Sequence, residues 1–214
     1  MARIQEFLRP ATLTEARRLL RQDAGRIPLA GGTFLAAHVP RTATGLVDLS
    51  RLNLAHVTRD AGGLSIGAMT TISALAATRA LGPLADLCRD VATQPLRNVI
   101  TVGGNVMLPL RWSDLPLLLT VLRAAFVVRG ATSRVMDADA FFAKPPAQAL
   151  RRGDLLTEVR VPPLTGLRLA RHKIVRAHGD VPALHVAVAA HRRRGLARDV
   201  RIAFVAQKPL PTRL

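Results

Sequence analysis

The sequence is poor in cysteine and in aromatic residues. A single cysteine, Cys88, stands among 214 residues, which excludes an internal disulfide, a four-cysteine iron–sulfur site and a cysteine-based structural zinc cluster. Tyrosine is absent, and one tryptophan and six phenylalanines complete the aromatic set. The chain therefore has few aromatic rings on which nucleic-acid bases could stack.

Long apolar runs are also missing. The longest, 115–122, contains Pro116 and Thr120 and is far shorter than the roughly 20 residues that span a bilayer. The first ten residues mix basic and acidic side chains and hold no long apolar core, unlike a secretory signal. We therefore expect no membrane helix and a cytoplasmic location.

Acidic residues are scarce beside basic ones. Thirty-one lysines and arginines face 14 aspartates and glutamates, a formal net charge of +17, which by itself favours a polyanion as partner. Only three of these cations are lysines, and the arginines are scattered apart from a cluster at 192–194. A dispersed excess is weak support for a dedicated polyanion site. We therefore do not expect a nucleic-acid partner, and a nucleic-acid-binding module stays the third hypothesis.

Hydrophobic residues make up 49% of the chain, enough to build substantial cores. Thr12 and Glu15 form a capping box ahead of apolar residues at helical spacing, which predicts a helix over 13–22. Further helices are predicted at 71–80, 83–93 and 115–123. Strands are predicted at 26–30, 45–49, 64–68, 97–102, 125–128, 155–161, 167–175, 183–191 and 200–206.

Two glycine pairs, Gly31-Gly32 and Gly103-Gly104, each follow a predicted strand. Glycine permits a positive φ and carries no Cβ, so successive backbone N–H groups can converge on a phosphate oxygen. Neither pair belongs to a Walker loop or a Gly-x-Gly-x-x-Gly fingerprint. The polar side chains beside them are Thr33, Thr101 and Asn105. Together the two turns predict a dinucleotide pyrophosphate held between two lobes.

Six short segments follow one another in order and spacing over nearly the whole chain. They are LAGGT at 29–33, LVDL at 46–49, IGAMTT at 66–71, RNVITVGGN at 97–105, SDLP at 113–116 and LLTEVRVP at 155–162. Each is weak alone, but six in register are specific. With them the chain resembles the FAD-binding (medium) subunit of the molybdenum hydroxylases, the group of xanthine dehydrogenase, aldehyde oxidase and carbon monoxide dehydrogenase.

The resemblance implies an α+β fold. A two-lobed FAD-binding part of the molybdopterin dehydrogenase flavoprotein type would be followed by a C-terminal domain with an antiparallel three-stranded sheet. We expect lobes at 1–57 and 58–163 and the C-terminal domain at 164–214. Family members usually continue for several tens of residues beyond 200–203, so we expect this last domain to be shortened and its sheet to expose apolar surface to a partner.

The resemblance also assigns FAD as cofactor. Its pyrophosphate and ribityl region would be wrapped, largely through backbone N–H groups, by Leu29, Ala30, Gly31, Gly32, Thr33, Phe34 and Leu35 and by Thr101, Gly103, Gly104 and Asn105. Asp114 would approach the flavin or the adenine. Lys173 and Asp180, in a Lys-x-x-Arg-x-x-Gly-Asp element, would lie near the isoalloxazine, where a lysine can stabilise negative charge on the reduced ring.

The family's reaction is electron transfer. A molybdopterin-binding large subunit hydroxylates the substrate, an iron–sulfur small subunit carries the electrons, and the flavin of the medium subunit passes them to an external acceptor. The resemblance therefore implies an FAD-dependent oxidoreductase subunit of a heteromeric complex. The molybdenum–pterin and the 2Fe-2S clusters would lie on partner subunits, in agreement with the single cysteine of this chain.

Several residues leave alternatives open. Phe34 stands where the family often has a small polar or acidic residue, which with the short C-terminus motivates a second hypothesis, a family-derived scaffold or repurposed protein without flavin redox function. Trp112 either flanks the flavin or caps a core, and Asp48 either caps a turn or touches the cofactor. Cys88 is expected in the core. No metal site is expected, because metal-ligand spacing is absent around His172, His178, His185 and His191.

Overall fold

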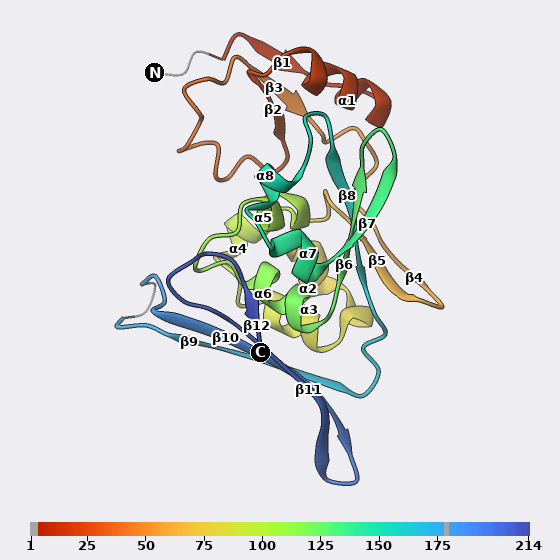
Figure 1. Ribbon diagram of the computed structural model, residues 1–214, viewed down its shortest axis with the longest axis vertical. Helices are drawn as coiled ribbons and strands as arrows, with labels where there is room; N and C mark the ends of the chain where they lie inside the picture. The colour runs from red at the N-terminus through yellow and green to blue at the C-terminus, as the bar shows by residue number, and fades with distance from the viewer. Residues whose placement is uncertain (1–3, 178–179) are drawn as a thin grey trace.

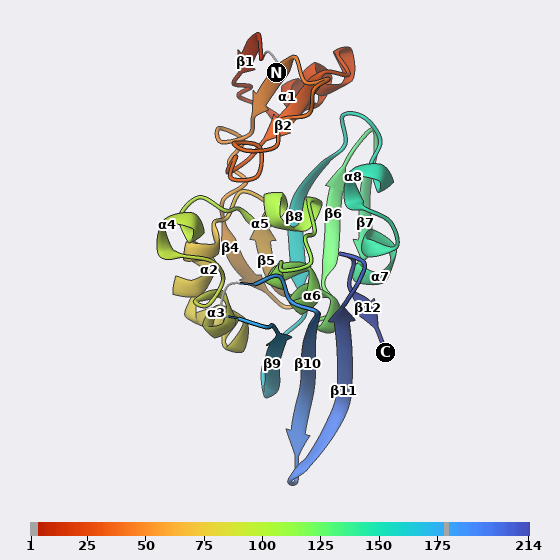
Figure 2. The same cartoon turned by 90° about the vertical axis from the view of Figure 1, so that its left-hand side faces the viewer.

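The computed structural model describes residues 4–177 and 180–214, which form three sheets and a central group of helices (Figure 1). The three sheets follow one another along the chain and along the long axis of the molecule (Figure 2). We name them the N-terminal, central and C-terminal sheets. The division into domains at 57 and 163 remains our proposal.

The N-terminal sheet is parallel, with the order β1-β3-β2. Its strands are β1 (Glu6–Leu8), β2 (Arg26–Leu29) and β3 (Gly45–Asp48). Helix α1 (Leu13–Gln22) has the predicted bounds, and its Thr12 Oγ1 accepts from the Glu15 N–H at 3.2 Å, as a capping residue does. Its buried Ala16 and Leu20 share a small core with Val47 of β3.

The central sheet is antiparallel, with the order β4-β5-β8-β6-β7. Its strands are β4 (Val57–Asp60), β5 (Gly63–Gly67), β6 (Ala125–Arg129), β7 (Ser133–Asp137) and β8 (Leu155–Val161). The helical segments between them are α2 (Ile72–Ala77), η1 (Arg79–Leu81), α3 (Pro83–Cys88), α4 (Gln94–Arg97), α5 (Val102–Met107), α6 (Asp114–Val121), α7 (Ala138–Phe142) and α8 (Pro146–Ala149). The expected helices at 71–80 and 83–93 are therefore shorter than predicted.

Helix α6 lies at the centre of the molecule, and all eight of its residues are buried. The helical layer around it separates the central sheet from the C-terminal sheet (Figure 1). A helix without a polar face is stable only when it is covered on every side. Asp114, its first residue, is therefore held in the interior between two sheets.

The C-terminal sheet is antiparallel, with the order β12-β11-β10-β9. Its strands are β9 (Leu167–Ile174), β10 (Leu184–Arg193), β11 (Leu196–Val205) and β12 (Thr212–Arg213). The predicted count of three strands was wrong, because β12 adds a short fourth strand beside Ala203 and Phe204. A tight turn joins β10 to β11: Arg194 and Gly195 have φ of 49° and 79°, as a two-residue β-turn requires.

The predicted strand at 97–102 is also wrong. Residues 94–97 form α4, and Thr101 begins α5 by accepting the Gly104 N–H on its Oγ1 at 3.1 Å. Thr101 makes only an isolated bridge with Thr71. Thr101 and Val102 are buried at the start of this helix, whereas Val99 is exposed. Tertiary context therefore overrides the strand propensity of these β-branched residues.

Candidate functional site

The two glycine segments of the sequence meet in space. A Cβ placed on Gly31 would lie 1.9 Å from the carbonyl oxygen of Val99, and a Cβ on Gly104 would lie 3.8 Å from the Cβ of Ala30. Gly31 is therefore needed for the approach of backbone to backbone. The segment after β2 and the segment that begins α5 form one site.

The turn after β2 presents a series of backbone N–H groups. Gly32 has φ of +69°, and the chain turns so that the Ala36 N–H donates to the Gly32 carbonyl at 2.9 Å. Within the described chain, the N–H groups of residues 31–35 donate no hydrogen bond. Successive free N–H groups in a turn with positive φ make a concave anion-binding site. Leu29, Phe34 and Leu35 are partly buried around this turn, and Thr33 is exposed.

The start of α5 differs from our expectation for it. Its backbone N–H groups already have acceptors: Val102 donates to Thr70 O, Gly103 to Ala68 O, Gly104 to Thr101 Oγ1 and Asn105 to Thr101 O. These N–H groups therefore already donate to protein acceptors, and the wrapping of the FAD pyrophosphate by this segment stays a prediction. What it offers is the side chain of Asn105, whose Oδ1 is buried and has no hydrogen-bond partner in the part of the chain that is described.

A second group of polar residues surrounds Asp114. The Lys173 Nζ lies 3.0 Å from its Oδ2, while the Arg171 Nε and the His185 Nε2 lie 3.0 Å and 3.3 Å from its Oδ1. Burial alone would raise the pKa of Asp114. The contacts with His185, Lys173 and Arg171 outweigh it and hold that pKa below its ordinary value. Asp114 is therefore an ionised carboxylate inside the protein.

Lys173 is fixed by two acceptors. Besides the Asp114 carboxylate, its Nζ donates to the carbonyl oxygen of Trp112 at 3.1 Å. Lys173 and Arg171 thus share the Asp114 carboxylate, and Arg171 also lies 3.7 Å from a carboxylate oxygen of Asp90. The side chain of Trp112 itself is 49% exposed, and of its two interpretations the core cap is wrong.

Asp180 takes no part in the Asp114 ion pairs. It is exposed and lies 3.8 Å from Arg176. Gly179 of the same sequence element lies outside the described residues, as does His178. The structure thus brings Lys173 to Asp114 rather than to Asp180.

Two other residues are explained by local contacts. Asp48 is a turn residue: its carboxylate accepts from the Ser50 N–H and Oγ, each at 2.9 Å, and from the Arg9 Nε at 3.1 Å. Phe34 stacks on His38 with ring centroids 4.4 Å apart. The Phe34 ring therefore packs locally, against the residue that follows the turn at 33–37.

Sequence reasoning missed Arg171 and His185 as neighbours of Asp114. The alternating burial of β9 places Arg171 on the same face as Lys173, and this spacing was available in the sequence. His185 is the register partner of Lys173 on β10. That pairing depends on how the two strands align, which the sequence pattern does not fix.

No group of three or more potential metal ligands occurs among residues 4–177 and 180–214. Cys88 is fully buried, as expected, and burial together with the nearby Asp114 charge raises the pKa of its thiol to about 12. A protonated, enclosed thiol is neither a nucleophile nor a metal ligand. In the same described residues, no helix has the length and apolarity to cross a bilayer.

Residues 2–164 match the family described as the FAD binding domain in molybdopterin dehydrogenase. The chain belongs to this family. It is 30% identical over 207 residues to the glyceraldehyde dehydrogenase medium chain of Sulfolobus acidocaldarius, covering 92% of this chain and 74% of that protein. It is 32% identical over 196 residues to the carbon monoxide dehydrogenase medium chain of Afipia carboxidovorans, covering 86% and 67%.

Solved structures of this family have the same fold. A chain of carbon monoxide dehydrogenase from Hydrogenophaga pseudoflava superposes with a TM-score of 0.89 at 29% identity, covering all of this chain and 78% of that one. For quinoline 2-oxidoreductase from Pseudomonas putida 86 the TM-score is 0.87 at 26% identity, with coverage of 97% and 76%. The chain thus spans about three quarters of the length of these chains.

Membership of this family confirms several predictions from the sequence. The fold is the α+β FAD-binding fold of the medium subunits, FAD is the cofactor, and the protein is an oxidoreductase subunit. The site fits that cofactor, because the free N–H groups of 31–35 suit a phosphate and Asn105 holds an unpaired buried amide oxygen.

Proposed function

We propose that this chain is the electron-transfer subunit of a multi-subunit molybdenum hydroxylase. The observation that supports FAD binding by particular residues is a set of polar groups without partners. Five successive backbone N–H groups, 31–35, and the buried Oδ1 of Asn105 lack partners in the described chain, and they lie on segments that touch at Gly31. In our proposal the N–H groups hold the FAD pyrophosphate, and the Asn105 Oδ1 accepts a hydrogen bond from a hydroxyl group of the cofactor.

FAD, when bound, supplies the redox chemistry. The role we assign to Lys173 is electrostatic. Asp114 and the Trp112 carbonyl oxygen hold its ammonium in one place, and fixed positive charge stabilises negative charge that develops nearby. Lys173 would thereby favour the reduced flavin, and Asp114 would act by positioning Lys173.

The partners in this proposal are two other subunits. Electrons would come from the 2Fe-2S clusters of an iron–sulfur small subunit, which receives them from a molybdopterin-binding large subunit, and would leave through the flavin to an external acceptor. Two of the relatives named above are medium chains of dehydrogenases, which supports such an assembly. The net charge of +17 would then serve complementarity to partner subunits.

Competition between ligands tests the site. Flavin-stripped chain is titrated with FAD, ADP and riboflavin, and binding is followed by flavin fluorescence and calorimetry. Because the pyrophosphate is the group recognised, ADP should displace FAD whereas riboflavin should bind far more weakly. Asn105→Leu should weaken FAD binding about tenfold, the worth of one well-placed buried hydrogen bond.

Asn98→Leu is the matched control, because Asn98 is exposed and its Oδ1 already accepts from Gln94. It should leave FAD affinity unchanged. Equal weakening by both variants would contradict the assignment of Asn105. A chain that takes up no FAD at all would favour the scaffold hypothesis that Phe34 motivates, and tight, steeply salt-dependent binding of an oligonucleotide would favour the nucleic-acid hypothesis.

A further inference from the structure

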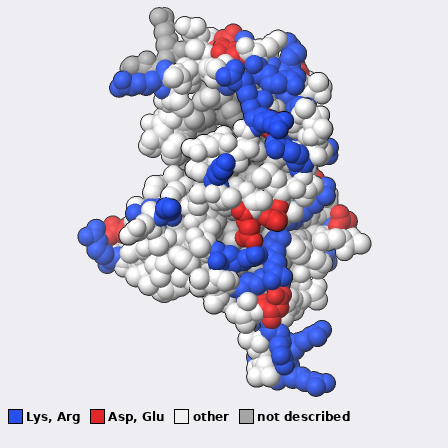
Figure 3. Space-filling view, viewed as in Figure 1, with Lys and Arg blue, Asp and Glu red and all other residues white. Residues whose placement is uncertain are grey.

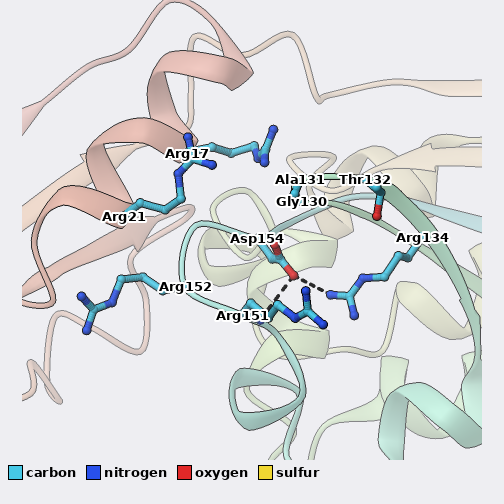
Figure 4. A pocket seen from close by; sticks show the side chains of 9 residues that line it. All are labelled: Arg17, Arg21, Gly130, Ala131, Thr132, Arg134, Arg151, Arg152 and Asp154. Carbon is cyan, nitrogen blue, oxygen red and sulfur yellow. Dashed lines mark hydrogen bonds and ion pairs between the residues drawn. The ribbon is translucent and has the colours of Figure 1, made fainter.

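A pocket of about 200 Å³ lies between α1 and the central sheet (Figure 4). Its walls are the α1 helix, the turn that joins β6 to β7, and the loop that leads into β8. The charged residues that line it are Arg17, Arg21, Arg134, Arg151, Arg152 and Asp154. None of these residues belongs to the flavin site described above.

Two glycines build this pocket. A Cβ on Gly153, which has φ of +79°, would lie 2.3 Å from the Cγ of Arg21, so the loop before β8 presses directly on α1. The Arg17 Nε donates to the Gly153 carbonyl at 3.3 Å. A Cβ on Gly130 would lie 2.2 Å from the Asp154 Oδ1, so this glycine makes room for the carboxylate. The arginines therefore project from backbone that is closely packed.

The pocket carries uncompensated positive charge. Asp154 is the single acid among its lining residues, which leaves an excess of four positive charges. Its Oδ2 lies 2.5 Å from the Arg134 guanidinium and also accepts the Arg151 backbone N–H. The guanidinium groups of Arg21, Arg151 and Arg152 donate no hydrogen bond in the described chain.

A further carboxylate, Asp23, compensates little of the positive charge of this pocket. Asp23 lies close enough to feel the charge of Arg152, but its oxygens accept from the Gly25 N–H and the Thr44 Oγ1 at 2.8 Å and 3.1 Å. In Figure 3, basic side chains cover the region of α1 in the upper part of this face. Arginines of α1 thus face arginines of the central part, and their repulsion opposes the packing of the two.

We propose that this pocket binds a phosphate group, either inorganic phosphate or the phosphate of a small phosphorylated molecule. Guanidinium forks match phosphate oxygens in pairs, and Thr132 adds a hydroxyl at the rim. The volume is below the roughly 300–1,000 Å³ of pockets that enclose drug-sized ligands, and no aromatic residue lines it. The pocket therefore suits the anion itself and offers no platform for a nucleotide base.

The bound anion would bridge α1 and the loop before β8, and would remove the repulsion between their arginines. A ligand that binds the folded chain but not the unfolded chain stabilises the folded state by mass action. Phosphate should therefore raise the unfolding temperature of the full chain, and this effect does not depend on the flavin.

The test is calorimetric titration and thermal unfolding of FAD-saturated chain with inorganic phosphate or glycerol 3-phosphate, against sodium chloride at equal ionic strength. Phosphate should bind and should raise the unfolding temperature more than chloride does. Tighter binding of glycerol 3-phosphate would identify an organic phosphate as the ligand, and the reverse would identify the free anion.

Variants locate the binding. The double variant Arg151→Gln, Arg152→Gln should weaken phosphate binding at least tenfold, about the worth of one charged hydrogen bond, and should be no less stable than the parent in phosphate-free buffer. Arg21→Gln should act in the same direction. The matched control, Arg192→Gln with Arg193→Gln at the end of the β10–β11 hairpin, should bind phosphate like the parent.

Equal phosphate affinity in the pocket variants and the control variant would overturn the proposal. So would an increase in unfolding temperature that chloride reproduces, or a chain that binds polyanions such as heparin but not phosphate. Flavin absorbance of the same samples reports FAD occupancy separately. Failure of the phosphate site is therefore distinguishable from failure of the flavin site.

Discussion

The Nζ of Lys173 lies 3.0 Å from the Oδ2 of Asp114 and so joins β9, the first strand of the C-terminal sheet along the chain, to the first residue of the buried helix α6. Each residue matched a family element in the sequence, but the two elements are separate there. Their ion pair ties the C-terminal sheet to the helical layer and gives the expected flavin-tuning lysine a fixed position.

Replacing Asp114 tests the importance of this ion pair for stability. Asp114→Asn leaves Arg171 and Lys173 without their buried counter-charge, which is expected to lower the free energy of unfolding by about 3–5 kcal/mol. Chemical denaturation of the full chain measures the change. Asp180→Asn, at an exposed position, should change it by less than about 0.5 kcal/mol. Equal effects of the two variants would contradict the central role of Asp114.

Acid should weaken the protein through the same carboxylate. The pKa of Asp114 lies below its ordinary value of 3.8, so its ion pairs contribute fully above about pH 4 and are lost as the pH falls through the lowered pKa of the folded state. Denaturation midpoints between about pH 3 and 6 should fall towards the acid end. Asp114→Asn should show a shallower fall, and parallel curves for parent and variant would contradict this account.

Cys88 should be unreactive in the folded chain. Burial and the neighbouring Asp114 charge raise the pKa of its thiol to about 12, so at pH 8 almost no thiolate is present. Ellman's reagent should detect no thiol before denaturation and one per chain after it, because Cys88 is the only cysteine. Rapid labelling of native protein would place this helix at the surface instead.

Gly31 should not tolerate a side chain. A Cβ there would lie 1.9 Å from the Val99 carbonyl oxygen, so Gly31→Ala forces apart the two segments of the flavin site. We expect a loss of about 1–3 kcal/mol in stability, typical of overpacking, together with weaker FAD binding. Gly62→Ala is the control, since the nearest atom to its new Cβ would be a mobile Asp60 oxygen at 3.2 Å. Unchanged FAD affinity in Gly31→Ala would contradict the site.

Removing the charge of Lys173 should shift the midpoint potential of the bound flavin. Lys173→Met takes away the ammonium that Asp114 and Trp112 hold, so the midpoint potential of bound FAD should become more negative because the reduced form loses a nearby positive charge. Lys144→Met, at an exposed loop position, should leave the potential unchanged. A potential unaffected by Lys173→Met would assign this lysine a purely structural role. Spectroelectrochemical titration makes the comparison.

Patterns local to one element were predictable from the sequence. Helix α1 and strand β8 have the predicted bounds, because a capping box and an alternating apolar run depend on few neighbours. The short strands β1, β4, β7 and β12 were missed. They take their structure from pairing with other strands, as β1 does with β3, which local sequence does not encode.

The candidate site was predicted in parts. Glycine pairs and the family elements located both sides of it, but the glycines of α5 proved to sit in a helix start whose N–H groups are already bonded. The group of Arg171, Lys173 and His185 around Asp114 depends on strand register and on the packing of β9 against α3 and of β10 against α6. Such contacts between distant segments follow from tertiary structure alone.

The most direct test of the central claim is the absorbance spectrum of the purified full chain, with its flavin counted after denaturation. We predict yellow protein that releases about one FAD per chain on unfolding, as one pyrophosphate site predicts. Colourless protein that takes up no FAD from solution would contradict the account.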